Sequence, residues 1–282
     1  MNIHAIRTGT VAVKSSQPDG GGRRRRSFAR VLADRDWTDP LPIFAWLIEH
    51  PEGPIVVDTG EIARATEPGY FTAWQPYFRL GVREWVAPDE EIGPQLRRLG
   101  VAPDDVRRVV ITHFHTDHAG GLPHFPRTEI VTSRRAFAEA RGLLGKVRGF
   151  LPQHWPDGLA PTLVDFESGP FGPFPASTRL TAAGDVHLVP TPGHTGGHLS
   201  VVVEDAETVT FLAGDASYTE RLMLGGRADG VAPKPSQAVE TLGRIRRLAA
   251  ERPTVYLPSH DPDAATRLAA GQVAVVPSAG AA

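Results

Sequence analysis

The chain alternates short apolar runs with amphipathic stretches, which is the pattern of strands interleaved with helices. Apolar runs bounded by turn residues predict strands at residues 44–50, 54–60, 107–112, 187–190, 198–204, 208–214 and 254–258. Helical periodicity predicts helices at residues 89–99, 137–144 and 236–251. The turn Pro51-Glu52-Gly53 joins the first two strands as a hairpin. Strands mixed with helices and hairpins predict an α/β (α+β) fold of mixed sheets covered by helices.

No linker divides the sequence, so we expect a single domain over residues 1–272. Within that domain, three glycines followed by four arginines predict an exposed loop at residues 18–26. Residues 64–85 form an insertion that is rich in aromatic side chains. The last segment, residues 273–282, has too little to pack and is expected to be disordered.

Composition narrows the class of protein. The 282 residues include no cysteine, which excludes disulfide frameworks, cysteine-ligated zinc, iron–sulfur clusters and thiol nucleophiles. The formal net charge of −2 argues against a dedicated nucleic-acid binder, and the run Arg23 to Arg26 is interpreted as solvated rather than as a nucleic-acid or lipid contact. There is no signal-peptide pattern and no apolar run near the ~18 residues of a membrane span. We therefore expect a cytoplasmic protein without nucleic-acid or membrane partners.

The strongest chemical signal directly follows the strand predicted at residues 107–112. Four metal-capable side chains occupy six positions there: His113, His115, Asp117 and His118. Imidazole and carboxylate groups are ligands for Zn, Fe, Mn or Co. In an irregular loop, alternate residues point to different sides, so one such loop can serve two metal ions.

Three further candidate ligands stand at strand ends or in a tight turn: His194, Asp215 and His260. Strand ends at one edge of a sheet are where α/β proteins assemble their sites. A buried acid needs a partner, and a metal ion is one that would satisfy it. Asp215 also has a counterpart in the first half of the chain, because Asp58 likewise ends a strand beside a glycine. This repeat suggests the duplication of a β-rich half.

The order His-x-His-x-Asp-His, then PGHT, an acid after a strand and a final His, resembles the metallo-β-lactamase superfamily. The resemblance implies an αββα sandwich of two mixed sheets and two divalent metal ions, zinc first, with Fe, Co or Mn as alternatives. It implies that one ion is held by His113, His115 and His194, the second by Asp117, His118 and His260, with Asp215 as the bridge. It also implies that Asp58 holds the histidine-bearing loop, unless that residue simply turns the chain at the end of a strand.

A closer resemblance is to the N-acyl homoserine lactonases, in which a tyrosine three residues after the bridging acid points at the substrate carbonyl. Tyr218 occupies that position, or else it is packed on its loop. The resemblance implies a homodimeric, quorum-quenching enzyme in which a metal-bridging hydroxide opens the lactone ring. Tyr218 would stabilise the oxyanion and Asp117 would pass the proton to the ring oxygen.

Aromatic clusters suggest an apolar channel for an acyl chain, although core packing explains them equally well. The candidate substrate contacts are Trp74, Tyr77, Phe78, Phe150 and His154. On the same scaffold, other lactones, carboxyl esters, thioesters or organophosphates are the alternative substrates. A β-lactam, a nucleic acid, or a purely binding role for the metals is less favoured.

Overall fold

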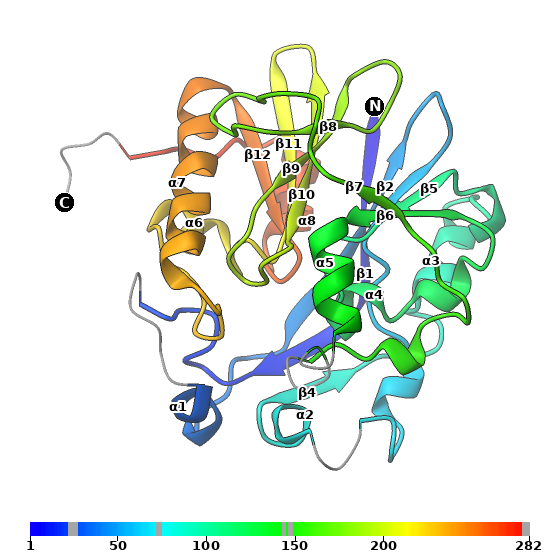
Figure 1. Ribbon diagram of the computed structural model, residues 1–282, viewed down its shortest axis with the longest axis vertical. Coiled ribbons are helices and arrows are strands. Elements are labelled where there is room, and N and C mark those ends of the chain that lie inside the picture. The colour runs from blue at the N-terminus through cyan, green and yellow to red at the C-terminus, as the bar shows by residue number, and fades with distance from the viewer. Residues whose placement is uncertain (22–27, 72–74, 143–144, 146–148, 278–282) are drawn as a thin grey trace. The chain divides into compact units, whose positions relative to one another are not determined.

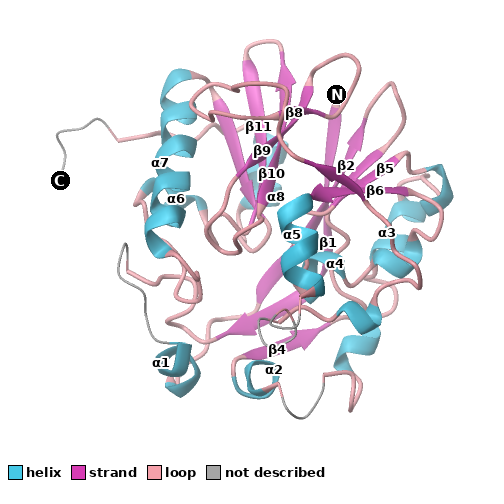
Figure 2. Cartoon of the chain, viewed as in Figure 1, coloured by secondary structure: helices cyan, strands magenta, loops and turns pink. Residues whose placement is uncertain are grey.

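The computed structural model describes residues 1–21, 28–71, 75–142, 145 and 149–277. The chain divides into two compact units, each with its own sheet (Figures 1 and 2). The N-terminal unit comprises Met1–Ser15 and Ala29–Asp165, and the C-terminal unit comprises Ser16–Phe28 and Phe166–Ala282. Asp58 and Asp215 fall in different units, as expected from the repeat of strand-end acids.

The N-terminal unit is built on a seven-stranded mixed sheet with the order β4-β1-β2-β3-β5-β6-β7. Its first strands pair antiparallel, whereas β3, β5, β6 and β7 run parallel to one another. The strands are β1 (Asn2–Val13), β2 (Leu41–Glu49), β3 (Ile55–Val57), β4 (Val82–Trp85), β5 (Arg108–Val110), β6 (Glu129–Ser133) and β7 (Thr162–Val164). Because β3 and β5 are parallel, their carboxyl ends lie at one edge of the sheet, where ligand-bearing loops are usually found.

The α-helices among the described residues of this unit are α1 (Phe28–Ala33, whose first residue falls in the C-terminal unit), α2 (Pro76–Leu80), α3 (Ile92–Arg98), α4 (Thr116–Ala119) and α5 (Arg134–Arg141). Short 3₁₀ turns lie at Ala63–Thr66, Pro103–Asp105, Leu122–His124 and Pro152–His154. The core includes Leu47, Val109, Ile111 and Phe114 together with Leu96 of α3. The strand that precedes the candidate metal loop is therefore anchored in the core, which makes the end of that strand a rigid mount.

The C-terminal unit is built on a five-stranded mixed sheet with the order β12-β11-β10-β9-β8. Its strands are β8 (Thr178–Arg179), β9 (Val186–Pro190), β10 (Leu199–Asp205), β11 (Thr208–Gly214) and β12 (Thr254–Pro258), and its helices are α6 (Glu220–Leu224), α7 (Pro235–Glu251) and α8 (Ala264–Ala270). The apolar face of α7, with Leu242, Ile245 and Leu248, packs in one cluster with Phe211 and Tyr256 of the sheet. Among the described strands of this sheet, β11 and β12 pair in parallel and the other neighbours pair antiparallel.

The predicted elements are present, with shifted ends and some omissions. The hairpin of β2 and β3 and the strands β9 to β12 are confirmed, as is the expectation of two mixed sheets with helices. Helix α5 begins at Arg134 rather than at residue 137, because the Ser133 hydroxyl accepts a hydrogen bond from the Ala136 N–H and caps the helix. The longest missed strand is β1, whose sequence NIHAIRTGTVAV has no regular alternation of apolar and polar positions.

Two surface predictions need correction. The loop expected to be exposed at residues 18–26 is buried at Gly20, whose N–H donates to the Ala228 carbonyl at 2.8 Å, while residues 22–27 lie outside the described part. The tail expected to be disordered from residue 273 is packed at Ala274, whose N–H donates to the Thr254 carbonyl at 2.8 Å. In both cases a backbone hydrogen bond orders the segment, although its side-chain composition did not predict an ordered structure. Among the described residues, no helix is long and apolar enough to cross a membrane.

Candidate metal centre

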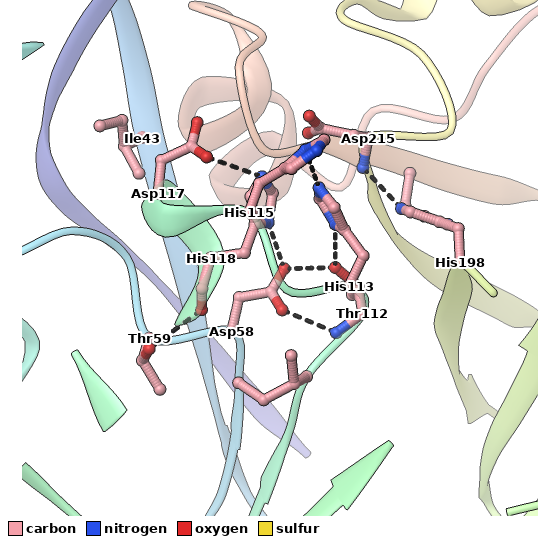
Figure 3. A network of polar contacts seen from close by, with 12 residues as sticks. Ile43, Asp58, Thr59, Thr112, His113, His115, Asp117, His118, His198 and Asp215 are labelled. Atoms are coloured by element: carbon pink, nitrogen blue, oxygen red, sulfur yellow. Dashed lines mark hydrogen bonds and ion pairs between the residues drawn. The ribbon is translucent and has the colours of Figure 1, made fainter. Parts of the chain in front are cut away.

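The four clustered candidate ligands lie between the end of β5 and the end of α4, all in the N-terminal unit (Figure 3). His113 and His118 are completely buried, and His115 and Asp117 are partly exposed. Burying an imidazole raises the free energy of the folded state unless its nitrogens have partners, so the groups around each ring indicate its role.

Asp58 ties this loop together. Its Oδ1 accepts the Thr112 N–H at 2.8 Å, and its Oδ2 lies 2.8 Å from both the Thr112 hydroxyl and His118 Nδ1 (Figure 3). A carboxylate only accepts, so His118 Nδ1 donates and Nε2 carries the lone pair. Asp58 is completely buried and adopts the left-handed φ of 57°. The acid therefore does more than turn the chain, since it fixes both the backbone and an imidazole of the loop.

The hydrogen bonds of His113 likewise leave the lone pair of its ring on Nε2, as in His118. The Thr112 hydroxyl donates to Asp58, so its oxygen accepts from His113 Nδ1 at 3.1 Å, which leaves the lone pair on His113 Nε2. That Nε2 lies 2.9 Å from His115 Nδ1. This is the distance of a hydrogen bond between the two rings, and nitrogens this close also suit a transition-metal ion, which would take both lone pairs at once. The residues of this loop therefore fit a metal ion.

The C-terminal unit holds the other three candidate ligands, which follow β9, β11 and β12 respectively. Asp215 is buried between two imidazoles: its Oδ2 lies 3.4 Å from His194 Nε2 and its Oδ1 lies 3.4 Å from His260 Nε2. These distances exceed the ~2.7–2.9 Å of a direct charge-assisted hydrogen bond. One carboxylate with a separate imidazole at each oxygen suits two cations.

Two further side chains hold this second set in place. His194 Nδ1 lies 3.2 Å from the buried Asp229 Oδ2, so the acid accepts the Nδ1 hydrogen and Nε2 faces Asp215. His198 Nε2 accepts the Asp215 backbone N–H at 3.0 Å (Figure 3). Asp229 was not predicted, because it belongs to no motif. His198 is engaged as a structural residue, because its other ring nitrogen, Nδ1, lies 2.8 Å from the Thr191 hydroxyl.

Tyr218 lies in the C-terminal unit and is only 3% exposed. Its ring stacks on His260 with centroids 5.3 Å apart and an interplanar angle of 26°. The Gln17 side-chain amide donates a hydrogen bond to the Tyr218 hydroxyl oxygen at 2.8 Å. Gln17 is a second residue that no sequence motif indicated, since it stands 201 positions before its partner.

The proposed acyl-chain contacts separate into two groups within the N-terminal unit. Phe150 is buried and stacks on His115, with centroids 4.9 Å apart, whereas Phe78 is half-buried and stacks on Phe71 at 4.2 Å. A Cβ built on Gly149 would lie 3.6 Å from the His115 ring and 3.7 Å from the Phe78 ring, so these rings surround one glycine. Apolar rings therefore adjoin a candidate ligand.

The other proposed contacts are less directly connected to the loop. His154 stacks on Tyr70 at 4.0 Å and its Nε2 donates to the Tyr70 carbonyl, while burial lowers the His154 pKa. Tyr77 packs edge-on against Phe78 at 5.5 Å. Trp74 lies outside the described residues. His154 is thus engaged as a structural partner of Tyr70.

Two carboxyl groups near the loop were also missed, the completely buried Glu61 and the half-buried Glu84. Burial raises the pKa of Glu61 to about 8, and the nearby charges of Asp117 and Glu91 raise it further, against hydrogen bonds from Ile62 and Thr116. Burial, together with Glu61 and Asp117, also raises the pKa of Glu84. A Cβ on Gly120 would lie 2.2 Å from Glu61 Oε1, so glycine lets α4 approach this acid.

Comparison with known proteins yields one matching family and several relatives. The model of the metallo-beta-lactamase superfamily matches residues 38–260. A "probable metallo-hydrolase" of Mycobacterium tuberculosis (strain ATCC 25618 / H37Rv) is 35% identical over 191 residues, which cover 64% of this chain and 58% of that protein. An N-acyl homoserine lactonase of Bacillus thuringiensis is 27% identical over 225 residues, which cover 78% of this chain and 82% of the lactonase.

Among solved structures, an N-acyl homoserine lactone hydrolase with N-hexanoyl-L-homoserine bound at its catalytic metal center has a TM-score of 0.75. The identity is 23% and the match covers 93% of each chain, so this likeness shows a shared fold. The match to the mycobacterial protein spans only 58% of its length. The family model, by contrast, includes Asp58 and all seven candidate ligands from His113 to His260. The chain belongs to the metallo-β-lactamase superfamily.

Proposed function

We propose that this chain is a metal-dependent hydrolase that opens the lactone ring of N-acyl homoserine lactones. The observation that carries the proposal is the donor set. The N-terminal unit has buried imidazoles whose Nε2 atoms are selected by an acid and a hydroxyl, and the C-terminal unit has a carboxylate placed between two imidazoles. Family membership supports the inference that both units contribute to one centre. The B. thuringiensis relative, which is named a lactonase, supports the substrate class.

The proposed centre holds two divalent ions, zinc first. His113, His115 and His194 would hold one ion, Asp117, His118 and His260 would hold the other, and Asp215 would serve both. When bound, the two cations would supply a water molecule that ionises near neutral pH and a positive charge beside the carbonyl oxygen. Cysteine is absent from the chain, so no thiolate competes for these ions.

Two of the chain's own residues would then complete the reaction. Tyr218 donates its hydroxyl hydrogen to the lactone carbonyl oxygen as negative charge develops on it. Asp117 accepts the proton that the water molecule loses and delivers it to the ring oxygen as the carbon–oxygen bond breaks. The products balance, since one lactone and one water give one N-acyl homoserine with a free hydroxyl and a carboxyl group.

The proposed position of the acyl chain follows from the aromatic contacts of the N-terminal unit. Phe150 and Phe78 lie beside His115 around Gly149, so an apolar chain on a lactone held at this ligand would meet their rings. His154 is the weaker candidate, because its ring is already stacked on Tyr70. We further propose a homodimer, which light scattering of the zinc-loaded protein would test.

The deciding experiment is a substrate panel assayed with a pH indicator. N-acyl homoserine lactones of several chain lengths are compared with aryl esters, a thioester, a cephalosporin and a phosphotriester. We expect the lactones to be turned over fastest, about two zinc ions per chain, and loss of activity on complete chelation. We also expect Tyr218→Phe to lower kcat on the lactones about 10–1000-fold, which is the range for one oxyanion donor.

Two outcomes would contradict the proposal in different ways. Turnover of another substrate but of no lactone would retain the hydrolase and reject the substrate class. Activity that survives complete removal of metal would reject the metal centre itself.

A further inference from the structure

Within the C-terminal unit, the segment that follows β1 pairs with the loop between α6 and α7. The Gly230 N–H donates to the Gln17 carbonyl at 2.7 Å, and the Gly20 N–H donates to the Ala228 carbonyl at 2.8 Å. We call this pairing of residues 17–20 with residues 227–230 the clasp. It brings a segment from the beginning of the chain beside the loop that carries Asp229, the acid that orients His194.

The two segments of the clasp approach each other closely. A Cβ on Gly20 would lie 2.4 Å from the Asp229 carbonyl oxygen, and one on Gly230 would lie 2.6 Å from the Ser16 carbonyl oxygen. Both distances are shorter than real Cβ contacts, so glycine is required on each side. Arg227 adds a two-bond ion pair to Asp19, with distances of 2.9 and 3.1 Å. The backbone of Gln17 is therefore fixed from both directions.

The fixed backbone directs the Gln17 side chain onto Tyr218. Gln17 is 1% exposed and Tyr218 is 3% exposed, and the amide Nε2 donates to the phenol oxygen at 2.8 Å. An amide hydrogen that occupies one lone pair of the phenol oxygen restricts rotation of the hydroxyl group. The hydroxyl hydrogen of Tyr218 is then directed away from Gln17.

We propose that Gln17 is a positioning residue for the reaction: it holds the Tyr218 hydroxyl as an acceptor, so that the hydroxyl hydrogen is presented to the substrate carbonyl oxygen. This inference rests on the proposed function, because it requires Tyr218 to donate to a substrate. Donors that are oriented before the reaction stabilise a developing oxyanion without reorganising. The clasp thus connects residues 17–20 to the chemistry of a residue two hundred positions later.

The experiment is a double-mutant cycle in the zinc-loaded protein. Gln17→Leu and Gln17→Glu are each made alone and combined with Tyr218→Phe, and kcat and KM are measured for every variant. Leucine removes the amide hydrogen, so we expect kcat to fall about 3–10-fold with KM little changed. A glutamate carboxylate accepts the phenol hydrogen and withdraws it from the substrate, so we expect Gln17→Glu to lower kcat about 10–100-fold.

The coupling between the Gln17 and Tyr218 substitutions distinguishes a positioning role of Gln17 from a packing role. With the phenol hydroxyl deleted, Gln17 has nothing to orient, so either Gln17 variant should change kcat less than about twofold in the Tyr218→Phe background. Gln272→Leu, at an exposed glutamine of the same unit, is the matched control and should retain the kcat of the wild type. Melting temperatures of all variants report any loss of folding.

Three results would overturn the inference. The first is full activity of both Gln17 variants, the second is equal loss with and without the Tyr218 hydroxyl, and the third is a glutamate variant as active as the leucine variant. If no lactone is hydrolysed, the cycle is run on whichever substrate of the panel is turned over. Failure of the substrate class is thereby distinguished from failure of the role of Gln17.

Discussion

The two units present their candidate ligands in contrasting ways. In the N-terminal unit four ligands share six consecutive residues, and one buried carboxylate, Asp58, ties their loop to the sheet. In the C-terminal unit three ligands follow three different strands, and separate partners hold them. Asp229 orients His194, while His198 holds the backbone of Asp215.

This difference predicts different responses to damage. When the one residue that holds a contiguous loop is changed, several ligands of that loop lose their orientation together. Ligands that follow separate strands lose their orientation one at a time, because the hydrogen bonds of the sheet hold each strand independently. Variants of Asp58 and of Asp229 therefore test whether the contrast is real.

The largest effect is expected from Asp58→Asn. Asparagine tolerates the left-handed backbone at this position, so the change isolates the carboxylate from the turn. The amide can no longer accept from both Thr112 and His118 as the carboxylate does, and a buried donor left without its acceptor costs about 1–3 kcal/mol. We expect a lower melting temperature and zinc affinity reduced about 10–100-fold, measured by competition with a chelator. Wild-type zinc affinity in this variant would show that Asp58 only turns the chain.

A smaller, more local effect is expected from Asp229→Asn. The change removes the charge that accepts from His194 Nδ1 but leaves the sheet and the His198 contact untouched. We expect zinc affinity to fall about tenfold for one of the two ions. Stepwise zinc titration monitored by calorimetry would separate the two sites. An equal loss of zinc affinity at both sites, or a loss as large as that in Asp58→Asn, would show that the two units respond alike.

The smallest effect concerns the stability of the N-terminal unit and its dependence on pH. Burial raises the pKa of Glu61 to about 8, whereas the unfolded chain releases this proton near pH 4.5. Between these values the folded state binds the extra proton, so the free energy of unfolding falls as the pH rises. Glu61→Gln removes this dependence, so we expect its melting temperature to exceed that of the wild type by more at pH 8 than at pH 5.

The matched control for this measurement is Glu67→Gln, at an exposed glutamate of the same unit. It should show the same difference from the wild type at both pH values. A Glu61→Gln variant whose advantage shrinks as the pH rises would reverse the assigned direction of the Glu61 pKa.

Sequence patterning located most of the strands because each is a short apolar run with turn residues at its ends. It missed β1, where polar residues interrupt the apolar run and the strand pairs with β2 and β4. It also expected the segments at Gly20 and Ala274 to be free, although backbone hydrogen bonds hold both. Such bonds form with residues far away in the chain, so local composition does not report them.

By itself, the sequence determined the donor chemistry: the imidazoles and carboxylates, their crowding after one strand and their positions at the ends of others. Only the tertiary structure decided which nitrogen His113, His118 and His194 present, through Thr112, Asp58 and Asp229 respectively. It also decided that Gln17, rather than a sequence neighbour of Tyr218, contacts the Tyr218 hydroxyl. The physical reason is that ligand identity is a property of a side chain, whereas its orientation is set by hydrogen-bond partners within about 3 Å in space. Folding brings those partners together from anywhere in the chain.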